Sequence, residues 1–275
     1  MKKGRIRKKL REARQEIRQK KAVATVYLFL RVSVIAVMVA QFFNKNFENM
    51  FLCGLTLILL LLPTVLEREL HIELPNTLEV IIMLFIYAAE ILGEIQSFYT
   101  TFQGWDTMLH TLNGFLCAAI GFSLVDLFNR NERFSLSLSP AFMAVVAFCF
   151  SMTIGVLWEF FECTMDQLFL LDMQKDTIVH SIGSVMLDPT GGTTPGIIRD
   201  ITDVIVVSGG EQISLGLGGY LDIGLLDTMK DLFVNFIGAV VFSIVGYFYV
   251  KSRGQGKFAK NFIPQVREEK DDPAE

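Results

Sequence analysis

Apolar residues along this chain collect in runs of about 20, and charged residues collect between them. A helix needs about 20 mostly apolar residues to cross the hydrocarbon core of a bilayer. The pattern predicts an all-α fold, a polytopic six-helix transmembrane bundle with one long outer loop (residues 164–228) between the fifth and sixth spans. The six predicted spans are Ala22–Phe43, Phe47–Val65, Thr77–Phe98, Thr107–Phe128, Ala141–Cys163 and Met229–Val250.

The distribution of Lys and Arg orients these spans, because cytoplasmic segments of membrane proteins carry an excess of both residues. Eleven of the 25 lie in Met1–Lys21, and placing this segment inside puts 20 of the 25 on the cytoplasmic side. We therefore expect both termini to be cytoplasmic. Residues 1–21 then form a basic N-terminal helix, residues 22–250 the membrane domain and residues 251–275 a cytoplasmic tail. We expect Pro264–Glu275 to be disordered.

Composition refines this picture by exclusion. The chain is 52% hydrophobic with a mean hydropathy of +0.44, which excludes a disordered chain and, with the clustering, a single soluble domain. The net charge of −4 hides two opposite faces, because nine carboxylates in the outer loop face only Lys175 and Arg199. All four cysteines lie within spans, so a disulfide framework is not indicated. The basic N-terminal helix lacks aromatic readers of nucleic acid, so the partner we expect is the lipid bilayer and not nucleic acid.

The outer loop contains two locally readable segments. Val204–Val207 and Gln212–Leu215 flank the turn sequence Ser208-Gly209-Gly210-Glu211, which predicts a β-hairpin. Asp176–Leu187 is interpreted as a short helix lying on the membrane.

Ionisable residues inside the spans carry the functional signal. Each costs at least about 2.5–3.5 kcal/mol at the centre of a bilayer, so such a group faces a partner or a cavity. With the orientation above, they gather in the outer parts of four helices, and spacings of three or four residues place each set on one helix face. The set is Glu90, Glu94, Asp106, His110, Glu159, Glu162, Asp227, Asp231 and Asn235. Small residues, among them Gly114, Gly121 and Gly238, are expected to let the fourth and sixth spans approach closely.

A histidine among carboxylates suits a divalent ion such as Zn, Mn, Fe or Mg. We expect His110, Asp106, Glu159, Glu162, Asp227 and Asp231 as metal ligands. The same set without Asp227 supplies the candidate catalytic groups, and Glu90, Glu94 and Asn235 support them. The function that follows is metal-dependent chemistry or recognition, in the outer leaflet, on a lipid or cell-envelope headgroup.

Other interpretations stay open. The same layer of side chains can be a proton-sharing structural network, part of an ion- or solute-coupled transporter, or part of a non-catalytic scaffold or sensor. Whether the chain is an enzyme, what its substrate is and whether it forms oligomers do not follow from the sequence.

Three motifs follow one another in the last three predicted spans. They are Trp105-Asp106 with His110 and Gly114-Phe115, Trp158-Glu159-Phe160-Phe161-Glu162, and Asp227-Thr228 with Asp231 and Gly238-Ala239. On these motifs the chain resembles, over Leu92–Val250, the YjdF-type bacterial inner-membrane proteins, and more distantly VanZ-like membrane proteins associated with glycopeptide resistance. The resemblance implies a bacterial plasma membrane and brings no reaction with it.

Overall fold

The computed structural model describes residues 2–69, 72–130, 138–252, 256 and 258–266. The chain divides into two compact units. Unit 1 contains residues 1–154 and 234–275, and unit 2 contains residues 155–233. Two long helices, α7 (Pro140–Phe169) and α8 (Leu225–Lys251), contribute residues to both units.

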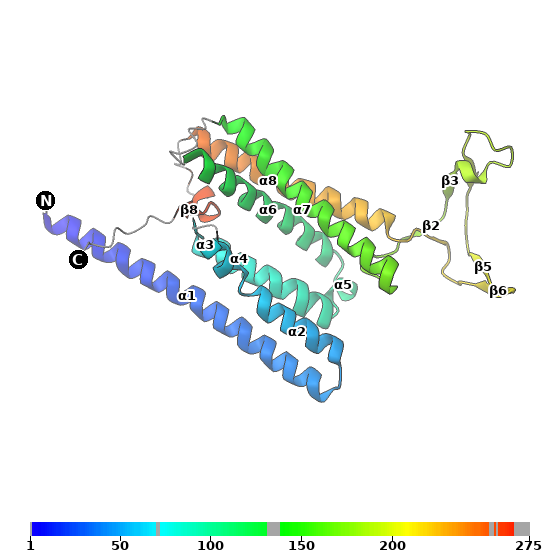
Figure 1. Ribbon diagram of the computed structural model, residues 1–275, viewed down its shortest axis with the longest axis horizontal. Helices are drawn as coiled ribbons and strands as arrows, with labels where there is room; N and C mark the ends of the chain where they lie inside the picture. The colour runs from blue at the N-terminus through cyan, green and yellow to red at the C-terminus, as the bar shows by residue number, and fades with distance from the viewer. Residues whose placement is uncertain (1, 70–71, 131–137, 253–255, 257, 267–275) are drawn as a thin grey trace. The chain divides into compact units, whose positions relative to one another are not determined.

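The helices follow the apolar runs of the sequence (Figure 1). Within the described ranges, five helical segments are long and apolar enough to cross a membrane: Lys20–Phe43, Phe47–Glu69, Trp105–Asp126, Pro140–Phe169 and Leu225–Lys251. Five of the six predicted spans are therefore confirmed as membrane-length helices. Besides α7 and α8, the α-helices are α1 (Lys2–Phe43), α2 (Phe47–Leu59), α3 (Leu62–Glu69), α4 (Asn76–Tyr87), α5 (Phe98–Thr101) and α6 (Trp105–Arg130).

The basic N-terminal segment and the first span form one continuous helix, α1. Lys2–Lys21 is helical without a break before the apolar run begins, and its placement in the cytoplasm stays a prediction. Within unit 1, α1 contacts both α2 and α4.

The third predicted span, residues 77–98, is shared between two helical elements. α4 is α-helical over 12 residues, and the next eight, Ala88–Ile95, form the π-helix η1. A π-helix bonds each N–H five residues back instead of four, and such segments are uncommon and frequent at functional sites. Neither element alone has the length of a membrane span, so the count of six spans stays a prediction.

Two glycines set the distance between α6 and α8 within unit 1. A Cβ added at Gly114 would collide with the backbone carbonyl oxygen of Asn235, and one added at Gly238 would collide with that of Thr111. Glycine at both positions lets the two backbones touch, which is how small residues join membrane helices. The close approach predicted for these two spans is confirmed at Gly114 and Gly238. Gly121, in contrast, lies against Phe150 of α7.

Aromatic side chains continue this contact along the two helices. Phe115 lies edge-on to Phe242 with ring centroids 5.0 Å apart, and Phe122 lies near Tyr249 at 6.5 Å. Because the residue numbers rise together in the two pairs, α6 and α8 run parallel in unit 1. The buried core of unit 1 includes Val34, Leu78, Met83, Ala118, Phe122, Met143, Ala239 and Phe242.

A short strand pair joins two distant parts of unit 1. β1 (Ile72–Glu73) pairs antiparallel with β8 (Gln265–Val266), with Glu73 opposite Gln265. The 3₁₀ turn η3 (Ala259–Asn261) precedes β8, and Phe262 and Ile263 beside it are buried. The disorder predicted for Pro264–Glu275 is therefore wrong for residues 264–266, and residues 267–275 lie outside the described residues.

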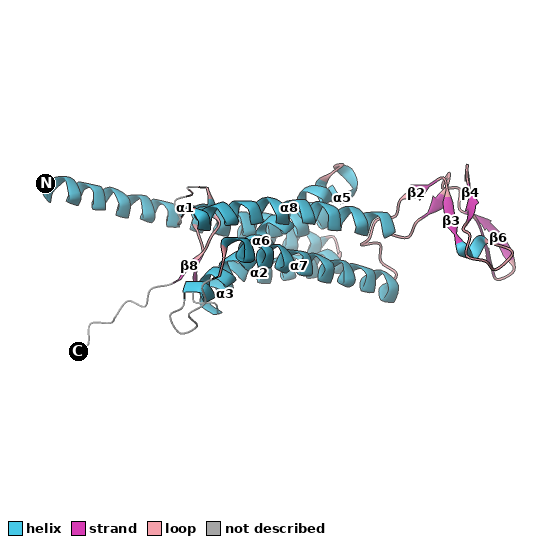
Figure 2. Ribbon diagram, turned by 90° about the horizontal axis from the view of Figure 1, so that it is seen from above, coloured by secondary structure: helices cyan, strands magenta, loops and turns pink. Residues whose placement is uncertain are grey.

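In unit 2, the segment between α7 and α8 forms small antiparallel strand pairs, drawn in magenta in Figure 2. The all-α prediction is corrected to this extent: the protein is mostly helical and carries short two-stranded sheets. The pairs are β2 (Ile178–Val179) with β7 (Tyr220–Leu221), β3 (Ile182–Ser184) with β4 (Gly196–Ile198), and β5 (Ile205–Ser208) with β6 (Glu211–Ser214).

The β5–β6 pair is the hairpin that the sequence predicts. Its turn residues Gly209 and Gly210 have φ values of 62° and 86°, as a two-residue type I′ turn requires. The helix predicted for residues 176–187 is wrong, because this segment forms β2, β3 and the 3₁₀ turn η2 (Val185–Leu187). Its β-branched residues and Gly183 favour extended backbone over helix.

Asp203 closes the base of this hairpin. Its carboxylate accepts hydrogen bonds from the backbone N–H of Val204 at 2.8 Å and of Gly216 at 2.9 Å, and from the hydroxyl of Ser214. The Ser214 hydroxyl, followed by the Val204 N–H, holds the pKa of Asp203 below the ordinary aspartate value. The charged carboxylate therefore organises this turn at neutral pH.

Candidate functional site

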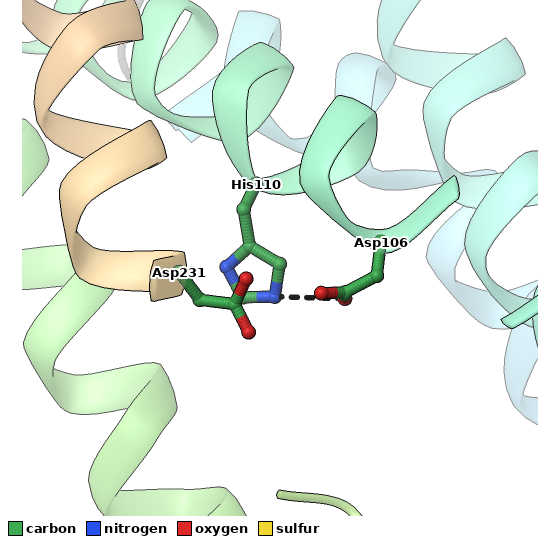
Figure 3. Close-up of side chains that lie close together, drawn as sticks. All are labelled: Asp106, His110 and Asp231. Atoms are coloured by element: carbon green, nitrogen blue, oxygen red, sulfur yellow. Dashed lines mark ion pairs between the residues drawn. The ribbon is translucent and has the colours of Figure 1, made fainter. Parts of the chain in front are cut away.

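The first part of the candidate site lies at the N-terminal end of α6, in unit 1. Asp106 and His110 are one helical turn apart, so their side chains are neighbours. The His110 Nε2 is 3.3 Å from Asp106 Oδ1, and the two side chains are 12% and 26% exposed. Figure 3 shows the imidazole edge directed at the carboxylate. The structure thus brings together the one histidine and the first carboxylate of the predicted set.

One turn further along α6, the site is supported by an amide pair. Asn113 Nδ2 donates to Asn235 Oδ1 at 3.3 Å, and Asn235 Nδ2 contacts the Met152 sulfur at 3.6 Å. Asn235 is 1% exposed, so these contacts lock its side chain between α6 and α7 within unit 1. This amide therefore fixes how α8 packs against α6 and α7 in unit 1, and the supporting role of Asn235 in the site stays a prediction.

In unit 2, the two predicted glutamates of α7 are buried, with 4% of Glu159 and 8% of Glu162 exposed. The indole N–H of Trp158 donates to Glu162 Oε1 at 2.7 Å. The Gln174 amide lies 3.5 Å from Glu159 Oε2 and donates to Thr228 Oγ1 at 2.5 Å. Each glutamate is thus held by a neutral donor.

The position of Gln174 depends on how the chain leaves α7. Asp166 Oδ1 accepts the backbone N–H of Met173 at 2.7 Å, and its Oδ2 accepts that of Gln174 at 2.8 Å. Because both oxygens bind the segment that follows the helix, the chain folds back against the last turns of α7. Asp166, which continues the helix face of Glu159 and Glu162 in the sequence, has this structural role.

The predicted aspartates of α8 share a lysine within unit 2. Lys230 Nζ is 2.7 Å from Asp227 Oδ1 and 3.5 Å from Asp231 Oδ1. The aspartate side chains are 10% and 2% exposed, whereas that of Lys230 is 46% exposed. Asp227 also accepts the backbone N–H of Lys175 at 2.9 Å. A partly solvated ammonium therefore compensates two buried carboxylates.

The remaining predicted residues, Glu90 and Glu94, lie on the π-helix η1 in unit 1. Glu90 is half-buried and Glu94 is exposed. A π-helix has about 4.4 residues per turn, so a spacing of four still places the two side chains at neighbouring positions on one side of η1. The shared face predicted for this pair stays a prediction.

Three residues of the site did not follow from the sequence. Asn113 is three residues after His110 and on the same face, so helical spacing alone was a sufficient signal. Gln174 and Lys230 gave no such signal. Gln174 is placed by the reversal of the chain at Asp166, and Lys230 sits at a helix end where a basic residue is usually solvated.

The chemistry of the α6 pair depends on the distance between its two ligand atoms. Two ligands that each lie about 2.0–2.1 Å from a tetrahedral Zn²⁺ are about 3.3 Å from one another. The Nε2 and Oδ1 atoms have this separation, and a nitrogen with a carboxylate oxygen suits Zn²⁺, Mn²⁺ or Fe²⁺. The same geometry also suits a proton shared between imidazole and carboxylate.

Comparison with known proteins places the chain in a family. The model of a family described as predicted membrane protein (DUF2238) matches residues 26–252, which include α6, α7 and α8. A protein of Thermotoga maritima, named an uncharacterized protein, is 26% identical over 106 residues, or 38% of this chain. The chain spans about half the length, 53%, of this curated relative. No solved structure matches the chain. Because the family model covers most of the sequence, the chain belongs to the DUF2238 family of predicted membrane proteins.

Proposed function

We propose that this membrane protein binds a divalent metal ion at the outer end of α6 and acts there on a lipid or cell-envelope headgroup. The observation that supports it best is the 3.3 Å separation of His110 Nε2 and Asp106 Oδ1 on a half-buried turn of a membrane-length helix. Ionisable side chains are energetically costly inside a bilayer, so they are rare in membrane helices and usually have a function.

Asp231 of α8 is the third ligand in this proposal, on the pattern of the sequence. Asp231 and Asn235 are one helical turn apart, so their side chains share a face of α8. The three proposed ligands are labelled in Figure 3.

A bound divalent ion would polarise a phosphoryl or carbonyl oxygen of the headgroup. Contacts among the chain's own residues would orient the side chains of the site and supply its charges. Asp106 and His110 hold one another in place, Lys230 pairs with Asp231 and Asp227, and Gln174 orients Glu159. Glu159 and Glu162 are the candidate general bases, because both are buried carboxylates that accept hydrogen bonds from the neutral donors Gln174 and Trp158.

Metal binding by the purified full chain tests this proposal. Protein stripped with EDTA and titrated with Zn²⁺ or Mn²⁺ is expected to bind about one ion per chain, and His110→Ala to weaken binding by about tenfold or more, equivalent to about 1.4 kcal/mol. The measurement is calorimetry together with elemental analysis of protein in detergent.

His180→Ala is the matched control, because His180 is exposed and its Nδ1 contacts the carbonyl of Ile201. It is expected to bind metal as the wild type does. Absence of stoichiometric metal in the wild type, or equal binding by the His110 and His180 variants, would falsify the proposal.

We also propose that the chain crosses the membrane six times with both termini in the cytoplasm. The pairing of β1 with β8 supports this, because it puts residues 72–73 and 265–266 on the same side. An even number of crossings must then lie between them. The helices α6, α7 and α8 supply three membrane-length segments, so α4 with η1 is needed as the fourth. The excess of Lys and Arg assigns the shared side to the cytoplasm.

Cysteine labelling tests this topology. In a background without the four native cysteines, Glu73→Cys and Gln265→Cys are expected to be shielded from a membrane-impermeant maleimide in sealed right-side-out vesicles. Lys45→Cys, between the first two spans, is expected to react. If Glu73→Cys and Gln265→Cys differ from each other in reactivity across intact vesicles, the even number of crossings is wrong.

A further inference from the structure

An open groove runs along the side of the α6–α8 contact within unit 1. It has a volume of about 510 Å³, and its walls include Thr107, Thr111, Leu112 and Phe115 of α6 with Gly238 and Val241 of α8. Ligand sites commonly measure about 300–1,000 Å³, so the groove is large enough for part of a small molecule. It is also distinct from the polar side chains of the candidate site.

The groove follows from the glycine contact. Because Gly238 has no side chain and lies against the Thr111 carbonyl, α8 contributes no bulk at this point of the wall. The hydroxyl of Thr111 donates to the Thr107 carbonyl at 2.7 Å. This hydroxyl is therefore already hydrogen-bonded, and the surface that remains for a ligand is almost wholly apolar.

The surroundings determine what can occupy it. α6 and α8 are both membrane-length helices, and Met108 and Val241 at the rim are 46% and 48% exposed. From Thr107 to Phe115 the groove extends about 12 Å along α6. A hollow of this kind on a membrane helix faces hydrocarbon, so its occupant is apolar, elongated and flexible.

The groove begins beside the proposed metal site. Thr107 follows Asp106, and Thr111 follows His110, so the apolar wall and the polar pair lie on adjacent faces of the same two turns. Trp105 precedes both. Its indole N–H is buried and has no acceptor among the residues that the structure describes, although buried indole N–H groups usually have one. A headgroup at this level would supply an acceptor.

We propose that the groove binds one acyl chain of a phospholipid whose phosphate headgroup lies at Asp106 and His110. This inference rests on the proposed function and names its substrate class. The headgroup meets the polar pair and the Trp105 N–H, while the chain lies against Thr111, Phe115 and Val241. Chain and headgroup contact different residues, so each part can be tested without the other.

Photolabelling tests the acyl-chain part. The full chain is placed in vesicles of phosphatidylethanolamine and phosphatidylglycerol that contain a trace of phosphatidylethanolamine with a diazirine on one acyl chain. After illumination in EDTA, the label is expected to concentrate on peptides with residues 107–115 and 238–241. Val241→Trp, which fills the groove, is expected to reduce this label about tenfold, equivalent to about 1.4 kcal/mol of binding.

The controls separate groove filling from misfolding. Val145→Trp adds the same side chain on α7, where Val145 is 58% exposed, and is expected to label as the wild type does. Met108→Trp at the rim repeats the groove test if Val241→Trp lowers the melting temperature. Even labelling over all exposed helix faces, or unchanged labelling of a folded Trp variant, would overturn the acyl-chain site.

A second lipid probe distinguishes acyl-chain binding in the groove from headgroup recognition at Asp106 and His110. Diacylglycerol with the same diazirine chain lacks the phosphate, so with metal present the wild type is expected to prefer the phospholipid probe about tenfold. His110→Ala is expected to lose this preference and to keep the groove label. Equal labelling by both probes in the wild type would refute headgroup recognition while leaving the acyl groove in place.

Discussion

Gly238→Ala and Gly114→Ala are each expected to destabilise the protein by about 1–3 kcal/mol, the range for forcing extra bulk into a close contact. The added Cβ at Gly238 would meet the Thr111 carbonyl, and that at Gly114 would meet the Asn235 carbonyl. Both obstacles are backbone atoms, which cannot turn aside as a side chain can. The helices α6 and α8 would have to separate, which would also lengthen the hydrogen bond between Asn113 and Asn235.

Denaturant or thermal unfolding of the purified protein in a mild detergent measures this effect. Gly54→Ala is the matched control, because Gly54 lies within α2 and a Cβ there would have no atom within 4 Å. Alanine favours a helix over glycine by about 1 kcal/mol, so this control is expected to be neutral or slightly more stable. The contact between α6 and α8 is not native if Gly238→Ala and Gly54→Ala unfold alike.

The spans could be predicted because the bilayer imposes a simple rule on the sequence. Only a helix satisfies its backbone hydrogen bonds in hydrocarbon, so apolar length alone placed α1, α2, α6, α7 and α8. The hairpin at Ser208–Glu211 was readable for a comparable reason, since two adjacent glycines allow the positive φ values of a tight turn. Both features depend on residues close together in the chain.

The parts that the sequence did not show depend on distant or non-standard geometry. Gln174 reaches Glu159 and Thr228 only because Asp166 reverses the chain after α7. The π-helix η1 departs from the 3.6-residue period that was assumed for the third predicted span. The pairing of β1 with β8 joins residues nearly 200 positions apart, and its two-residue strands leave no pattern in the sequence.

The candidate site was predicted in part for a physical reason. Helical spacing brought Asp106 to His110, and it identified the buried carboxylates of α7 and α8. It could not identify what compensates their charge. Lys230 sits between two carboxylates, although a lysine near a helix end in a membrane protein is usually solvated or snorkels to the interface. The metal ligands stay a proposal.

Lys230→Met is expected to destabilise the metal-free protein by about 1–3 kcal/mol, because it removes the partly solvated ammonium that pairs with two buried carboxylates. Its ammonium is 2.7 Å from Asp227 and 3.5 Å from Asp231, whose side chains are 10% and 2% exposed. Methionine keeps much of the apolar stem and removes only the charge. Unfolding in detergent with EDTA measures the loss without compensation from a bound metal ion.

Lys175→Met is a close control for this change. The side chains of Lys175 and Lys230 are 47% and 46% exposed, but Lys175 pairs at 3.6 Å with Asp172, which is 66% exposed. A solvated pair contributes at most about 1 kcal/mol, so the two lysines are equally exposed and differ in the burial of the carboxylates that they contact. Adding Asp227→Asn to Lys230→Met is expected to restore part of the stability, since the double variant lacks one of the two carboxylates that paired with the Lys230 ammonium. Equal losses from the two lysine variants, or no recovery in the double variant, would mean that the ion pairs of Lys230 with Asp227 and Asp231 do not stabilise the fold.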